Sequence, residues 1–136
     1  MPAIGRVLET ALYTANLQRA RAFYEGSLGL KPMVADGRMS AYALGETVLL
    51  LFRRGDSNIP VRLPGGTIPP HDGRGPMHVA FAVAKEELGE WQTLLESYAI
   101  EIEGRMQWPK GGESIYFRDP DGNLLEFATP GLWENY

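Results

Sequence analysis

One order of secondary structure occurs twice along this chain, and the repetition restricts the folds available to it. Apolar periodicity and turn signals predict strand, helix, strand, strand, strand within residues 7–52, and the same order returns within residues 77–129. Superposing the two halves places Glu9 on His78. We therefore predict an α+β fold of two βαβββ modules in tandem, forming a curved mixed sheet around a cavity with the helices on its outer face.

Local signals set the limits of the predicted elements. Asn16 is a plausible N-cap for the first helix, and Gly29 is placed to end it. The sequence Asp-Pro-Asp-Gly at residues 119–122 predicts a tight hairpin turn. The predicted strands are residues 7–14, 30–35, 39–44, 47–52, 77–83, 100–106, 114–118 and 123–129, and the predicted helices are residues 17–27 and 85–98.

A long connection separates the two halves. Residues 53–76 are rich in Gly and Pro and show no periodicity, which is typical of a linker or of a loop that covers a functional site. We predict a single domain over residues 1–136, with module one at 6–53, the connection at 53–76 and module two at 76–129.

Composition excludes several classes of function. The chain has 136 residues, 44% of them hydrophobic and 22% charged, and a formal net charge of −4 with scattered basic residues. This balance argues against a nucleic-acid or membrane partner. There is no cysteine, so disulfides, thiol nucleophiles and Cys-ligated metals are excluded. With no secretory-type apolar segment near the first residues, we expect a cytoplasmic protein.

Three ionisable residues share their strand faces with small alanines. Side chains alternate between the two faces of a strand, so Glu9 shares a face with Ala11, and His78 shares one with Ala80. Glu126 likewise lies opposite the bulky neighbours that would pack under a helix. The three residues are therefore predicted to line a cavity.

Each of the three has a plain structural alternative when it is considered alone. Glu9 would suit a solvated sheet edge, His78 would suit a hydrogen-bonded core position, and Glu126 would cap a turn or pair with Arg118. Their coincidence at corresponding strand positions favours a shared role. One imidazole and two carboxylates in a concave sheet would bind a divalent cation, which would also neutralise the buried acids.

Three stretches of the chain resemble the vicinal oxygen chelate superfamily, which includes glyoxalase I, fosfomycin-resistance thiol transferases, bleomycin-resistance proteins and extradiol dioxygenases. The stretches are residues 8–30 (LETALYTANLQRARAFYEGSLGL), 75–83 (GPMHVAFAV) and 114–127 (SIYFRDPDGNLLEF). The resemblance implies metal ligands at Glu9, His78 and Glu126, and it places Tyr116 in the substrate pocket.

The chain departs from the individual members of that superfamily at three places. Glyoxalase I usually has a fourth ligand, a glutamate, on the strand where this chain has residues 49–51, all leucine. The fosfomycin enzymes carry a lysine where this chain has Met106 or Gln107. Extradiol dioxygenases use a further histidine, and the only other one here is His71, in the long connection.

The ligand set favours one reaction type and leaves two alternatives open. One histidine with two carboxylates suits a Lewis-acidic ion that holds two adjacent substrate oxygens, with Glu126 or Glu9 as general base. We predict a glyoxalase-like lyase or isomerase acting on a small carbonyl compound. The alternatives are an extradiol-type dioxygenase and a metal-free protein that sequesters a small molecule.

Further expectations concern the pocket, the cofactor and the assembly. Tyr116 is the candidate hydrogen-bond donor in catalysis, and Phe52, His71 and Trp108 are candidate pocket residues. The cofactor is one divalent ion per site, with Zn, Ni, Mn, Co and Fe not distinguished. Short two-half members of the superfamily commonly share sites between subunits, so we expect a homodimer that joins Glu9 of one chain to His78 and Glu126 of the other.

Overall fold

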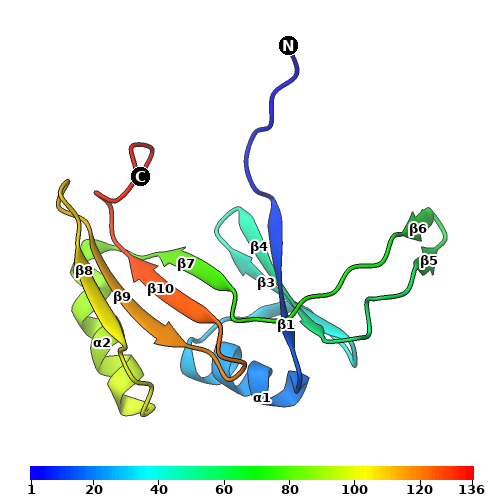
Figure 1. Cartoon of the computed structure of the whole chain (residues 1–136), viewed down its shortest axis with the longest axis horizontal. Coiled ribbons are helices and arrows are strands. Elements are labelled where there is room, and N and C mark those ends of the chain that lie inside the picture. Colours follow the sequence, from blue (N-terminus) through cyan, green and yellow to red (C-terminus); the bar gives the residue numbers. More distant parts are fainter. The chain divides into compact units, whose positions relative to one another are not determined.

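The computed structural model describes residues 1–136, which divide into two compact units, Met1–Arg74 and Gly75–Tyr136. The boundary lies close to the predicted start of module two at residue 76. Each unit contains a four-stranded mixed sheet and a helical segment (Figure 1). The predicted α+β class and the repeated order of elements are confirmed.

The first unit contains β1 (Glu9–Thr14), α1 (Leu17–Arg21), η1 (Ala22–Ser27), β2 (Pro32–Ala35), β3 (Met39–Leu44) and β4 (Thr47–Arg53). Its sheet has the order β1-β4-β3-β2, with β1 parallel to β4 and the other pairs antiparallel. The first strand begins at Glu9, two residues later than predicted.

The second unit contains β7 (His78–Ala82), η2 (Lys85–Glu87), α2 (Leu88–Ser97), β8 (Gly104–Gln107), β9 (Glu113–Arg118) and β10 (Leu124–Ala128). Its sheet has the order β7-β10-β9-β8, with β7 parallel to β10, so it repeats the connectivity of the first sheet. None of the helices has the length and apolar character needed to span a membrane.

The helical segment of the first unit forms as the sequence predicts but is wound differently. The Asn16 side chain accepts a hydrogen bond from the Arg19 N–H at 3.0 Å, and Gly29 has φ of 72°, which allows the chain to leave the helix. Residues Ala22–Ser27 form a π-helix, in which the Leu28 N–H donates to the Phe23 carbonyl. Tyr24 and Tyr42 stack beneath it, with ring centroids 6.3 Å apart.

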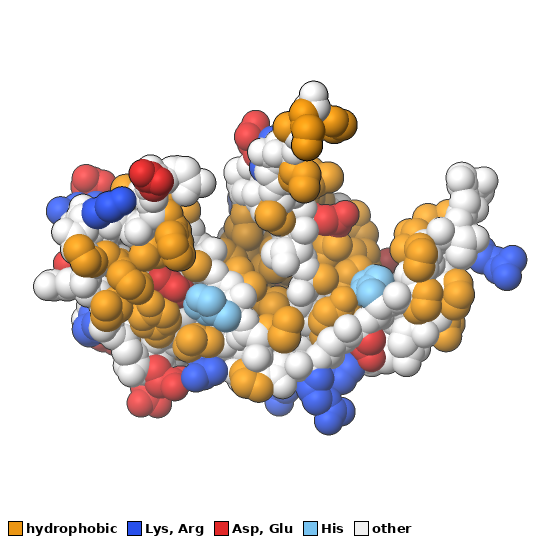
Figure 2. Space-filling model, turned by 45° about the horizontal axis from the view of Figure 1, so that its top comes forward, with side chains coloured by type: hydrophobic (Ala, Val, Ile, Leu, Met, Phe, Trp, Pro, Cys, Tyr) orange, Lys and Arg blue, Asp and Glu red, His pale blue; other side chains and the backbone are white.

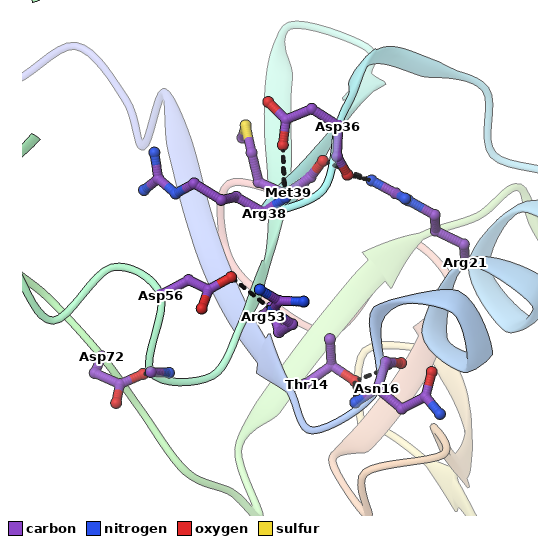
Figure 3. A network of polar contacts seen from close by, with 10 residues as sticks. Thr14, Asn16, Arg21, Asp36, Arg38, Met39, Arg53, Asp56 and Asp72 are labelled. Atoms are coloured by element: carbon purple, nitrogen blue, oxygen red, sulfur yellow. Dashed lines mark hydrogen bonds and ion pairs between the residues drawn. The ribbon is translucent and has the colours of Figure 1, made fainter.

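A polar network ties this helical segment to the sheet (Figure 3). The Arg21 guanidinium donates to the Ser40 hydroxyl and to the carbonyls of Asp36 and Met39. The Asp36 carboxylate in turn accepts the backbone N–H groups of Arg38 and Met39 at 2.8 and 3.0 Å. The turn between β2 and β3 is therefore fixed by side chains at both of its ends.

The long connection is more ordered than predicted. Residues Val61–Leu63 (β5) and Gly66–Ile68 (β6) form a short antiparallel hairpin around a turn at Pro64 and Gly65. Hydrophobic side chains gather on this hairpin (Figure 2), and Ile59, Leu63 and Ile68 are exposed. The sequence did not indicate this hairpin, because strands of three residues are too short to show a period.

The core of the second unit lies between α2 and one face of its sheet. Leu95, Phe117 and Leu125 are fully buried, and Trp91 lies against Phe127 with ring centroids 4.5 Å apart. Of the helix residues expected to point inward, Leu95 is buried, whereas Leu88, Trp91 and Leu94 are partly exposed. The opposite face of the same strands is left for the site residues.

Candidate metal centre

Glu126 is a buried carboxylate on the face of the second sheet opposite the one that packs on α2. It lies in the middle of β10, next to Tyr116 on β9, and is only 4% exposed. Its Oε2 atom accepts a hydrogen bond from the Ser114 hydroxyl at 2.5 Å. This contact satisfies one carboxylate oxygen and leaves the other facing His78.

His78 faces the other oxygen of Glu126. Its Nδ1 lies 2.9 Å from the Leu124 carbonyl, and its Nε2 lies 3.3 Å from Oε1 of Glu126. A carbonyl oxygen can only accept, so Nδ1 carries a proton, and Nε2 either donates a second proton to the carboxylate or presents a lone pair to it. In the second case two acceptors face each other unless a cation lies between them.

The separation of these two atoms fits a shared cation. Ligand atoms each about 2.0–2.2 Å from one ion, at angles between octahedral and tetrahedral, lie about 2.8–3.6 Å apart. The carbonyl that fixes Nδ1 is the kind of outer partner that orients a metal-bound histidine. His78 and Glu126 therefore fit two positions of a divalent metal site.

Neither unit alone completes such a site. No group of three or more His, Asp or Glu side chains comes close enough within the structure to hold a metal ion. Glu9, the third predicted ligand, lies in the other unit as the first residue of β1, and it is exposed. Its role as a ligand stays a prediction.

Glu9 lines a cavity of about 600 Å³ in the first unit, together with side chains of both the sheet and the long connection. The walls are mainly apolar and include Leu50, Phe52 and Ile68. A cavity of this size and character suits a small molecule. The predicted pocket residue Phe52 is one of its walls.

His71 also lines this cavity. Its Nδ1 lies 2.7 Å from the Tyr13 hydroxyl, and its ring lies edge-on to Phe52 with centroids 4.7 Å apart. Burial raises the pKa of Tyr13, and the nearby charge of Asp72 raises it further, so the phenol keeps its proton for this hydrogen bond. The connection thus brings His71 to the same cavity as Glu9.

Tyr116 and Trp108 have different surroundings. Tyr116 shares a sheet face with Glu126, and its pKa is raised by burial and then by the charge of that carboxylate. The Trp108 indole N–H donates to the Ser114 hydroxyl at 2.9 Å. Trp108 is therefore part of the hydrogen-bond network around Glu126. It is not among the residues that line the cavity of the first unit.

Ser114 and Tyr13 are site residues that the sequence reasoning missed. The signal for Ser114 was present, because it lies two residues before Tyr116 and so shares its strand face. Tyr13 lies on the Glu9 face of β1 by the same alternation. The contact of Tyr13 with His71 depends on the course of the connection, which no local pattern indicates.

A comparison with family models shows which protein family the chain belongs to. Residues 6–127 match the model described as the Glyoxalase/Bleomycin resistance protein/Dioxygenase superfamily. The chain belongs to this superfamily. The predicted resemblance to the vicinal oxygen chelate proteins is therefore confirmed.

Curated members of the superfamily include metallothiol transferases. The metallothiol transferase FosB of Shouchella clausii is 33% identical over 122 residues, which cover 88% of this chain and 77% of that protein. The FosB of Lysinibacillus sphaericus is 27% identical over 119 residues, which cover 87% of this chain and 77% of that protein.

Solved structures give the same fold. The lactoylglutathione lyase of Agrobacterium tumefaciens superposes with a TM-score of 0.85 at 35% identity, over 97% of this chain and 98% of that one. The fosfomycin resistance protein FosX of Mesorhizobium loti has a TM-score of 0.67 at 19% identity, over 98% of each chain, and so shows the fold alone. The names of the relatives indicate an enzyme, but they differ in reaction.

Proposed function

We propose that this superfamily member is a divalent-metal-dependent lyase or isomerase acting on a small carbonyl compound. The observation that carries the proposal is the approach of two potential ligand atoms, Nε2 of His78 and Oε1 of Glu126, to 3.3 Å. A divalent cation bound by both atoms would also pair the buried carboxylate. The similarity to a lactoylglutathione lyase supports the reaction class.

The proposed ligand set is completed by Glu9 of a partner subunit. Strands β1 and β7 are the edge strands of their sheets, so Glu9 and His78 both lie where a second sheet can adjoin. Since neither unit alone holds three ligands, a homodimer that pairs unlike units supplies the missing carboxylate. Such a dimer has two equivalent sites.

The residues present divide the chemical work. A bound divalent ion would polarise the substrate carbonyl as a Lewis acid. The carboxylate of Glu9 or Glu126 accepts the proton from the carbon next to that carbonyl. Tyr116, whose pKa is raised by burial, stays protonated and donates a hydrogen bond to the oxygen on which charge develops. The apolar cavity beside Glu9 holds the remainder of the substrate.

A second candidate is thiol transfer, which the curated relatives favour. Several proteins that match this chain are named metallothiol transferases. The same three ligands would serve that reaction. A thiol co-substrate would then attack the metal-bound substrate, and no proton would be moved between carbon atoms. The position of the expected lysine is taken by Met106 or Gln107, which weighs against an antibiotic of the fosfomycin type as acceptor.

Metal content and turnover of purified protein test the proposal. We expect one divalent ion per chain by elemental analysis, and turnover of the hemithioacetal of methylglyoxal and glutathione in the presence of Zn, Ni, Mn or Co. Glu126→Gln keeps the shape of the side chain and should lose the metal while the circular dichroism spectrum is unchanged. Wild-type protein that binds no divalent ion would contradict the proposal, and Fe(II)-dependent oxygen uptake with catechols would indicate the dioxygenase instead.

Subunit mixing tests the sharing of sites. Glu9→Gln and Glu126→Gln should each bind no metal alone. In a shared-site dimer, a heterodimer of the two variants has one intact site, so refolding an equal mixture should restore about a quarter of the wild-type metal content. No recovery on mixing would show that each chain builds its own site.

A further inference from the structure

A chain of hydrogen bonds with a fixed direction leads to the buried carboxylate of Glu126. The indole N–H of Trp108 can only donate, so the Ser114 hydroxyl oxygen accepts from it at 2.9 Å. The single hydroxyl proton of Ser114 is then available for Oε2 of Glu126, at 2.5 Å. The contact with Trp108 thus favours donation of the serine proton to Glu126.

The hydrogen bond between Ser114 and Glu126 lies where water cannot replace it. Ser114 is 1% exposed and Glu126 is 4% exposed, so each lost hydrogen bond would leave a desolvated polar atom. Oε2 of Glu126 is satisfied by this contact, whereas Oε1 faces Nε2 of His78. The two oxygens of one carboxylate therefore have different surroundings.

The turn that carries Trp108 is itself fixed. The Trp108 N–H donates to the Gly112 carbonyl at 2.8 Å, and the Gly111 N–H donates to the Trp108 carbonyl at 2.9 Å. Gly112 packs so closely on Gly131 that an added Cβ would lie 2.7 Å from its carbonyl carbon. The backbone from which the indole projects is therefore held by its own contacts.

We infer that Trp108 and Ser114 are positioning residues that hold Glu126 as a one-oxygen ligand, with Oε1 alone directed to the cation. This inference rests on the proposed metal site. A carboxylate without this contact can rotate and offer both oxygens, which changes the number of ligand atoms and the affinity. If the contacts served core packing alone, their removal would lower stability and leave metal binding as it was.

Metal titration of the full-length protein separates the two roles. We expect Ser114→Ala to raise the Kd for Zn²⁺ by about 10- to 100-fold, the usual effect of removing an outer partner of a ligand. Ser114→Thr keeps the hydroxyl and should bind Zn²⁺ more tightly than Ser114→Ala. The visible spectrum of the Co²⁺-loaded Ser114→Ala variant should differ from that of wild type because the number of ligand atoms changes.

A second variant keeps the test decisive if Ser114→Ala does not fold. Trp108→Phe removes the indole donor at a partly exposed position, and it should weaken Zn²⁺ binding less than Ser114→Ala and shift the Co²⁺ spectrum in the same direction. A folded Ser114→Ala or Trp108→Phe variant with the wild-type Kd and Co²⁺ spectrum would overturn the inference and leave the proposed function standing. Wild-type protein without affinity for either ion would overturn both.

Discussion

Leu50 and Glu126 occupy the same position in the two copies of one sheet. In the first unit Leu50 pairs with Ala11, two residues after Glu9, and in the second Glu126 pairs with Ala80, two residues after His78. The first unit therefore presents a leucine where the second presents a carboxylate. The position of Leu50 falls within residues 49–51, where the resemblance expects the fourth ligand of glyoxalase I.

Leu50→Glu is expected to add a metal ligand. By the register, the new carboxylate would lie beside Glu9 as Glu126 lies beside His78, on the wall of the same cavity. We expect Zn²⁺ affinity to rise on the order of tenfold, because affinity follows the number of charged ligands. Like-charge repulsion should also lower the melting temperature of the metal-free protein. Leu50→Gln is the matched control, and calorimetric titration that shows equal affinity for both variants would contradict the prediction.

Tyr116→Phe is expected to slow catalysis without weakening metal binding. The phenol is assigned a hydrogen bond to developing charge, and removal of one such donor typically lowers kcat on the order of 10². The Kd for Zn²⁺ should stay within a factor of about three, since Tyr116 is not a ligand. Tyr98→Phe, at an exposed position outside the sheet, is the control. A parallel loss of metal would show that Tyr116 supports the metal centre instead.

Tyr13→Phe is expected to loosen the β5–β6 hairpin. The variant removes the 2.7 Å contact with His71 and keeps the aromatic ring that stacks on Phe52. Loss of one partly buried hydrogen bond costs about 1 kcal/mol of unfolding free energy. Cleavage by trypsin after the exposed Arg62, within β5, should become faster than in wild type. Unchanged cleavage would mean that the contact does not hold the hairpin.

Stability should fall at low pH partly through Asp36. Hydrogen bonds from the backbone N–H groups of Arg38 and Met39 lower its pKa below the usual value. The folded state therefore keeps the carboxylate charged at a pH where the unfolded state has begun to bind a proton, and the contribution is fully present above about pH 4. It is lost as pH falls through the lower folded pKa. In Asp36→Ala the slope of unfolding free energy against pH below 4 should be shallower than in wild type, as measured by urea titration.

Asn123→Ala is expected to destabilise the second unit strongly. The Asn123 side chain accepts the Met77 N–H and donates to Asp119, both at 2.9 Å, and is only 1% exposed. Leaving these partners unsatisfied should cost about 2–4 kcal/mol of unfolding free energy. Asn58→Ala, at an exposed position, should cost little. Equal midpoints of urea unfolding for the two variants would contradict the assignment.

The order of elements and the faces of the strands were predictable because they depend on local periodicity. Leu12 and Thr14 are buried as alternation requires, and Asp119 to Gly122 form the predicted turn between β9 and β10. The π-helix was not predictable. The spacing of apolar residues does not show whether a backbone N–H bonds to the fourth or to the fifth residue before it. Pro64 and Gly65 were the only sequence signal for the β5–β6 hairpin.

For the candidate site, the sequence indicated individual residues but not the contacts between them. The sequence indicated His78 and Glu126, and the structure places their side chains 3.3 Å apart. The role of Trp108 could not be read from the sequence, because its contact with Ser114 depends on how the turn at residues 108–112 folds. The contribution of Glu9 as a ligand stays a prediction, because no local pattern determines how the units or subunits assemble.

The alternation of faces along β1, β7 and β10 has a consequence for how such a protein diversifies. Side chains beneath the helices determine whether the chain folds, whereas their immediate neighbours in the sequence face the opposite way. A single codon change can therefore alter reactivity while leaving the folding core untouched. Selection can then explore new chemistry on this scaffold one substitution at a time.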